Sequence, residues 1–162
     1  MDVAKLSRLR SGIRPMHRLY SPLVVTLGKL FNEIIEIEEK AIITGEFRDI
    51  SNNDMHIIEA IGLGEARSMS AVAKDLSVTV GTLTTAINNL VKKDYVRRVR
   101  SEKDRRVVLI SLKEKGEKAF HHHKQFHEDM IRATLEGLDQ EQTQVLIRAL
   151  TNLSVFFRRY EK

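Results

Sequence analysis

Apolar side chains recur at three- and four-residue steps along most of this chain, which is the spacing of one face of an α-helix. The pattern predicts a long helix over 23–43, a second from Ser51 to about residue 61, and a short third one that begins at Ser68 or Ser70. Further helices are predicted over 80–93, over 113–135 and from Asp139 to about residue 160.

Three of the predicted helices have clear start signals. Ser51 is followed three residues later by Asp54, and Asp139 by Gln142, which are capping-box spacings. Thr79 is a natural N-cap for the helix over 80–93, because its hydroxyl can accept from the first free backbone N–H groups. Ser77 and Val78 complete a three-residue turn between that helix and the short one before it.

Two β-branched runs, 96–100 and 107–112, flank the polar segment 101–106 and predict a β-hairpin with a charged tip. The expected fold class is therefore mainly α with a small β-hairpin. It has three parts: an opening helix, a compact helical module that ends in the hairpin, and two closing helices.

The composition of the chain narrows the kinds of functional site and the cellular locations that are possible. The absence of Cys excludes disulfides, thiolate metal sites and cysteine nucleophiles, and fits a reducing cytoplasm. No run approaches the ~18–20 apolar residues of a membrane span. Residues 1–20 are basic but lack the apolar core of a signal peptide. We expect a cytoplasmic protein with no membrane partner.

Positive charge is concentrated in two short segments. The chain carries a net charge of +5, yet residues 1–20 alone carry +4 and residues 92–106 carry +5, which leaves −4 for all other residues. Such a distribution is expected of a protein that meets a polyanion with a defined patch, although a solvated run of charges would look the same.

The helix over 80–93 has an outer face suited to DNA. At 100° per residue its apolar residues Leu83, Ile87 and Leu90 fall together and should face the core. The opposite face has no acidic group and consists of short polar side chains that can read base edges in a major groove. The residues assigned to DNA contact here, with the capping threonine, are Thr79, Gly81, Thr82, Thr84, Thr85, Asn88, Asn89 and Lys92.

The hairpin tip adds a second contact. It contains Arg100, Asp104, Arg105 and Arg106, one strand after the candidate recognition helix. A guanidinium group gains from the negative potential of a narrow minor groove, and Asp104 can orient Arg106 through an ion pair. The alternative is an ordinary charged hairpin tip, but the helix that precedes it favours a DNA-binding wing.

These segments resemble the MarR family of transcriptional regulators. The resemblance spans about residues 23–160 and rests on VTVGTLT (78–84), LVKKDYV (90–96), DRR (104–106) and LISLKEKG (109–116). It implies a homodimer that binds a pseudo-palindromic operator in double-stranded DNA, with Asp104 and Arg106 as wing acid and minor-groove arginine. The implied organisation is a winged helix-turn-helix domain over 21–162, with a DNA-binding module at 51–112 and dimerisation helices at 23–44 and 113–160. Residues 1–20 form a basic N-terminal extension without a counterpart in that pattern.

Within that family the chain is most similar to the fatty-acid-synthesis repressors of Gram-positive bacteria. The similar stretches are FRDIS (47–51), VTVGTLTTAINNL (78–90), RSEKDRRVV (100–108) and KQFH (124–127). This resemblance implies a repressor of fatty-acid-synthesis genes whose corepressor is acyl carrier protein bearing a long acyl chain. The apolar residues expected to line a slot for that chain are Ile34, Ile37, Met55, Ile58, Phe120 and Phe126.

A zinc- or small-ligand-responsive repressor of other genes is the alternative. His123 and His127 share one helical face within a histidine-rich tract, and zinc-sensing members of the family carry such a tract in the same helix. Further ligands would have to come from His17, His56 or the glutamates of the first helix. No metal or other cofactor is expected. An enzyme is not expected either, because the sequence has no phosphate-binding glycine loop and no nucleophile elbow.

Overall fold

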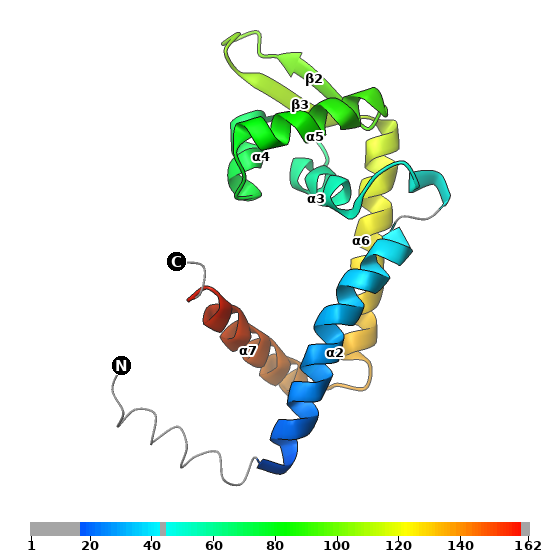
Figure 1. Cartoon of the computed structure of the whole chain (residues 1–162), viewed down its shortest axis with the longest axis vertical. Coiled ribbons are helices and arrows are strands. Elements are labelled where there is room, and N and C mark those ends of the chain that lie inside the picture. The colour runs from blue at the N-terminus through cyan, green and yellow to red at the C-terminus, as the bar shows by residue number, and fades with distance from the viewer. Residues whose placement is uncertain (1–16, 43–44, 160–162) are drawn as a thin grey trace.

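A computed structural model of the protein describes residues 17–42 and 45–159, so most of the predicted N-terminal extension lies outside the described residues. A compact module forms one end of the molecule (Figure 1), while α2 and α6 run side by side away from it and α7 follows at the far end. The elements are α2 (His17–Ile42), η2 (Gly45–Phe47), α3 (Asn52–Ile61), β1 (Arg67–Ser68), α4 (Met69–Asp75), α5 (Val80–Lys92), β2 (Val96–Arg100), β3 (Val108–Leu112), α6 (Glu114–Leu135) and α7 (Gln140–Phe157). The predicted fold class is confirmed.

The predicted helix starts are observed. Ser51 Oγ accepts from the backbone N–H of Asp54 at 3.1 Å, and the Asp54 carboxylate accepts from the backbone N–H of Ser51 at 3.1 Å. Asp139 and Gln142 form the same reciprocal pair at the start of α7. Of the two serines considered for α4, Ser68 is the cap. The first helix begins at His17, earlier than its apolar pattern predicts, and contains Pro22.

The hairpin belongs to a three-stranded antiparallel sheet of order β1-β3-β2. The two-residue strand β1 was not predicted, and it pairs Arg67 with Ile110 and Ser68 with Leu109. Two residues cannot show an alternating pattern, which explains the omission. Arg67 is held in place because its guanidinium donates to the Ala60 carbonyl and to the Asp75 carboxylate.

The core lies inside the module, between α3, α4, α5 and the sheet. Leu83, Ile87 and Leu90 are each at most 1% exposed, so the inner face predicted for α5 is confirmed. They belong to one apolar cluster with residues of α3, β3 and the first turns of α6. The outer face of α5 is thereby turned away from the core.

Tyr95, directly after α5, links the module to the base of α6. Its fully buried hydroxyl donates to Asp49 Oδ1 at 2.6 Å, and Lys115 Nζ donates to the other carboxylate oxygen at 2.9 Å. Burial of the phenol, together with the nearby Asp49 carboxylate, raises the pKa of Tyr95 well above its usual value. Partial burial opposes ionisation of Asp49, but the hydrogen bonds from Tyr95 and Lys115 hold the pKa of its carboxyl below the usual range. The tyrosine therefore stays a donor and the aspartate an acceptor at neutral pH.

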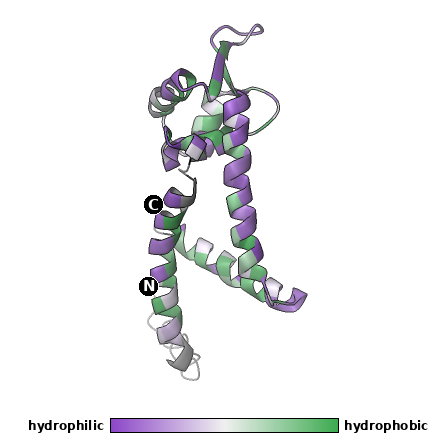
Figure 2. Ribbon diagram, turned by 90° about the vertical axis from the view of Figure 1, so that its right-hand side faces the viewer, coloured by the Kyte–Doolittle hydropathy of each residue, from purple (hydrophilic) through white to green (hydrophobic). Residues whose placement is uncertain are grey.

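The helices outside the module leave apolar side chains uncovered. No residue of α7 is buried within the chain. Figure 2 shows hydrophobic residues continuing along the helices beyond the module. Among the residues that the structure describes, no helix combines the length and apolar character needed to span a membrane. The large apolar side chains exposed on α2 and α7 are Tyr20, Leu23, Val24, Val25, Leu30, Phe31, Ile37, Val145, Ile147, Leu150, Val155, Phe156 and Phe157.

The first turn of α6 passes so close to Tyr95 that only glycine fits at residue 116. A β-carbon added there would overlap the Tyr95 carbonyl oxygen, which belongs to rigid backbone. We therefore expect Gly116→Ala to lower the free energy of unfolding by about 1–3 kcal/mol. Urea unfolding followed by circular dichroism measures this. Gly81→Ala is the control, because its β-carbon would lie at an ordinary 3.6 Å from Thr79 Oγ1, and it should leave stability unchanged or raise it by up to about 1 kcal/mol. Equal stability of the two variants would contradict the close contact.

Candidate nucleic-acid interface

The N-terminus of α5 is held by a threonine pair. Thr79 Oγ1 accepts from the backbone N–H of Thr82 at 3.1 Å, and the two hydroxyl oxygens lie 2.9 Å apart. Gly81 lies between them and is exposed. The start of the helix is therefore fixed by these hydrogen bonds and has no side chain at Gly81, so that its backbone can approach another macromolecule closely.

The outer face of α5 presents the predicted polar residues to solvent, with one exception. Thr79, Gly81, Thr82, Thr85, Asn88, Asn89 and Lys92 are all exposed. Thr84 is half-buried, and its hydroxyl donates to the Val80 carbonyl at 2.7 Å. It lines a hollow at the base of the hairpin together with Arg98 and Arg106. Thr84 is thus placed between the helix and the wing rather than at the centre of the outer face.

The sequence reasoning missed Arg98 as a member of this surface. Its Nη1 donates to Asn88 Oδ1 at 3.0 Å, which ties strand β2 to the outer face of α5. Strand alternation could have indicated it, because Val96 is buried and residues two apart share one face of a strand. The bond occupies the acceptor oxygen of Asn88 and leaves its amide N–H groups to donate elsewhere.

The hairpin tip is ordered by its own polar groups. Asp104 Oδ1 accepts from the backbone N–H of Arg106 at 3.0 Å and lies 3.4 Å from its Nε, so the predicted ion pair is observed. The Arg106 side chain is 94% exposed and extends from the tip into solvent. Arg100 and Arg105 line a second hollow of the tip with Ser101 and Glu102. An exposed arginine on an ordered support is suited to insertion into a minor groove.

The predicted effector residues fall into two groups. Met55 and Ile58 are completely buried in the core, and Phe120 and Phe126 pack against that core. Ile34 and Ile37 lie on α2, where Ile37 is about half exposed. Helix α2 contacts both α3 and α6, but four of the six residues lie in or against the packed core of the module, and Ile34 and Ile37 are not part of that cluster.

The histidine tract is brought against α3. His123 is buried, and its Nε2 lies 3.0 Å from Nε2 of His127, so the predicted pair does come together. His56 is also adjacent, together with Glu59, which the sequence reasoning did not consider. Of the other ligands considered, the His17 side chain and several glutamates of the first helix lie outside the described part of the chain.

Comparison with known sequences identifies relatives among transcriptional regulators. A family model described as "Transcriptional regulator SarA/Rot" matches residues 45–123. The HTH-type transcriptional regulator YpoP of Bacillus subtilis is 30% identical over 107 residues, which are 66% of this chain and 70% of that protein. The HTH-type transcriptional regulator SarZ of Staphylococcus aureus is 37% identical over 68 residues, which are 42% of this chain and 46% of that protein.

Solved structures extend the similarity to the whole described fold. FabT of Streptococcus pneumoniae, in complex with DNA, is 40% identical with a TM-score of 0.77, over 87% of this chain and 99% of that one. The MarR family transcription regulator SP03579 has a TM-score of 0.72 at 13% identity, over 92% of this chain and 97% of that one, and shows the fold alone. The comparisons therefore identify a DNA-binding transcriptional regulator, and DNA contact by the outer face of α5 and the hairpin stays a prediction.

Arg106→Ala should weaken binding to a selected DNA site by about 1–3 kcal/mol, because the variant loses a charged contact in the minor groove without losing any buried group. Fluorescence anisotropy at fixed salt, with a site selected from random duplexes by the unmodified chain, measures this. Arg132→Ala on α6, also an exposed arginine, is the control and should bind normally. Unchanged affinity of Arg106→Ala would refute the wing assignment.

Asn88→Ala should relax sequence preference more than it lowers affinity for random DNA, because amide side chains discriminate between bases in the major groove. Lys92→Ala should instead weaken specific and random DNA alike and reduce the salt slope by about one, as expected for a phosphate contact. Repeating the selection with each variant, and comparing the two consensus sequences, measures the difference. An unchanged consensus for Asn88→Ala would count against base readout by this residue.

Proposed function

The chain belongs to the MarR family of winged helix-turn-helix transcriptional regulators, and from this premise we propose that it is a dimeric repressor of fatty-acid-synthesis genes. Acyl carrier protein bearing a long acyl chain is the proposed corepressor. The observation that carries the proposal is the 40% identity to FabT in its DNA complex, which spans nearly all of that structure. The segments 47–51, 78–90, 100–108 and 124–127, which resemble fatty-acid-synthesis repressors, support it.

The proposed dimer is supported by the uncovered apolar side chains of α2 and α7. Phe31 and Phe157 meet edge to face at 5.9 Å, and with Leu150 and Leu153 they line an open groove. Apolar surfaces of this extent are rarely left exposed on monomers. A second copy packed through a two-fold axis would cover them and would present two α5 helices to a pseudo-palindromic operator.

The proposed corepressor must favour the DNA-binding conformation, since a ligand with equal affinity for two conformations shifts nothing. The seam between α2, α3 and α6 supports such a role, because it joins the module to the outer helices. Met55 and Ile58 are completely buried in the module core, so an acyl chain would reach them only by displacing side chains that pack against that core, such as Phe120 and Phe126. Acyl carrier protein itself would dock away from Arg98 and Arg100, because both lie on the side of the module that faces DNA.

Long acyl chains on carrier protein should tighten operator binding by about tenfold or more, and short chains should have little effect. The physical reason is that each methylene group of the acyl chain contributes at most about 0.8 kcal/mol of binding free energy when it is buried. Anisotropy titrations with carrier proteins bearing acyl chains of graded length, and with unacylated carrier protein, measure the response.

Ile37→Gln tests the seam in the same assay. It should reduce the response to long chains. Because Ile37 also belongs to the exposed apolar surface assigned to the dimer, light scattering of the variant must first show an unchanged dimer mass, and the response is then compared at equal dimer concentration. An operator affinity that is independent of acyl length would refute acylated carrier protein as the corepressor and leave another small ligand as the alternative.

A further inference from the structure

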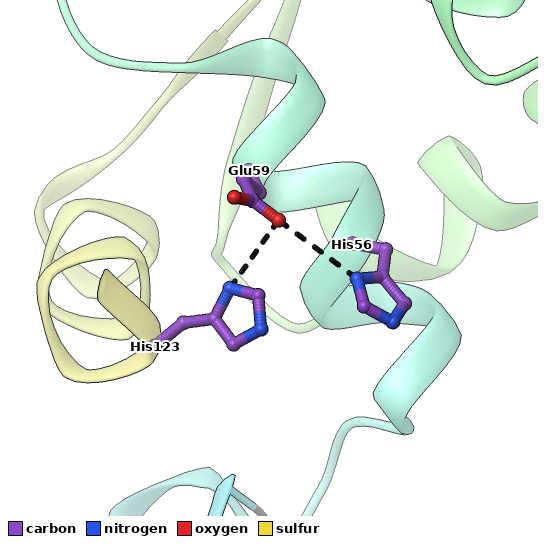
Figure 3. A group of neighbouring side chains, drawn as sticks. All are labelled: His56, Glu59 and His123. Carbon is purple, nitrogen blue, oxygen red and sulfur yellow. Dashed lines mark ion pairs between the residues drawn. The ribbon is translucent and has the colours of Figure 1, made fainter. Parts of the chain in front are cut away.

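Three metal-ligating side chains converge between α3 and α6. His56 and Glu59 lie one helical turn apart on α3, and His123 extends toward them from α6 (Figure 3). Glu59 Oε2 lies 3.5 Å from His123 Nδ1 and 3.8 Å from His56 Nδ1. The donor atoms of all three residues lie within 4.8 Å of one another.

The two separations that involve Glu59 are close to the edges of a metal coordination shell, and the donor atoms of the two histidines lie at most 4.8 Å apart. Zinc binds imidazole nitrogen and carboxylate oxygen at about 2.0–2.2 Å, which places neighbouring tetrahedral ligands about 3.4 Å apart. The distances of 3.5 and 3.8 Å are close to this value but longer than ordinary hydrogen bonds. A cation could therefore be accommodated by small rotations of the side chains, without movement of either helix.

The other ring nitrogen of His123 is already oriented. Its Nε2 lies 3.0 Å from His127 Nε2, one turn further along α6. If Nδ1 binds a metal, Nε2 must carry the proton and can donate it to His127. A ligating histidine usually donates its second ring N–H to a partner that fixes its tautomer and ring plane. His127 would thus act as a positioning residue and not as a ligand.

We propose that His56 Nδ1, a Glu59 carboxylate oxygen and His123 Nδ1 bind a zinc-type divalent ion, with water as the fourth ligand. Two imidazoles and one carboxylate suit zinc and other transition metals, whereas calcium and magnesium prefer oxygen donors alone. The proposal goes beyond the function proposed above and does not depend on acyl carrier protein.

The site is both accessible and anchored. The side chains of His56 and Glu59 are 44% and 53% exposed, so an ion can reach them from solvent. His123 is 1% exposed and is fixed by its surroundings. Because α3 belongs to the DNA-binding module and α6 runs away from it toward α7, a bound ion would hold these two helices at one separation.

Zinc titration of the full chain, freed of metal by a chelator, tests the proposal by isothermal titration calorimetry. We expect one ion per chain and proton release that increases at lower pH, because the imidazoles must be deprotonated. Zinc at ~100-fold above its dissociation constant should also raise the melting temperature by roughly 5–10 °C. Cobalt substitution should give the intense visible absorption of a four-coordinate ion.

His56→Ala and Glu59→Gln change exposed side chains and should each weaken zinc binding by at least about tenfold without unfolding the protein. His121→Ala and Glu128→Gln, exposed on other parts of α6, are matched controls and should bind zinc normally. The proposal is overturned if the unmodified chain binds no zinc at micromolar concentration. It is also overturned if the double variant of His56 and Glu59 binds as well as the unmodified chain, or if His121→Ala loses binding equally. None of these results involves DNA, so they do not bear on the repressor proposal.

Discussion

The close contact between the first turn of α6 and the backbone of Tyr95 determines how the two parts of this molecule are arranged. The Lys113 backbone N–H donates to the Tyr95 carbonyl at 2.9 Å, and Gly116 leaves no side chain to separate the two segments. The Tyr95 hydroxyl and Lys115 then share Asp49, which lies just before α3. Because α6 can leave the module only in the direction that these contacts permit, they set the angle between α5 and the outer helices. In a two-fold dimer this angle would set the spacing of the recognition helices, which must match successive major grooves about 34 Å apart.

The parts of the predicted DNA-binding surface are hydrogen-bonded to one another and are not held by the core alone. Thr79 fixes the start of α5, Asp104 fixes the backbone of the wing, and the bond from Arg98 to Asn88 joins the two. Pre-ordered contacts reduce the entropy that is lost on binding. The amide of Asn88 thus holds Arg98 of strand β2 and is also the exposed group that is predicted to contact bases.

Sequence reasoning identified the elements whose determinants are local. Capping signals at Ser51, Thr79 and Asp139 and the apolar face of α5 depend on neighbours within one helical turn, and all were confirmed. Contacts between segments distant in sequence were predicted only where the chemistry of a tract suggested a partner, as for His56 beside the histidines of α6. Strand β1 exists only because β3 offers it a partner, and Glu59 becomes relevant only when α6 brings His123 beside it. The same limit applies to Met55 and Ile58, because apolar periodicity indicates that a residue is turned inward but not whether it lines a slot or fills a core.

Helix α3 connects the two proposed ligand sites, because adjacent faces of this helix meet α6 in different ways. Met55 and Ile58 pack inward with Phe120 and Phe126, while His56 and Glu59 turn toward His123. An acyl chain between α3 and α6 would change how the two helices pack, whereas an ion bound at the adjacent face would hold their separation constant. Two ligands that bias the same pair of helices must alter each other's affinity by the same factor, whichever binds first. The α3–α6 contact is therefore the element through which either signal would reach α5, because α5 is packed on α3 through the core and has no direct part in either site.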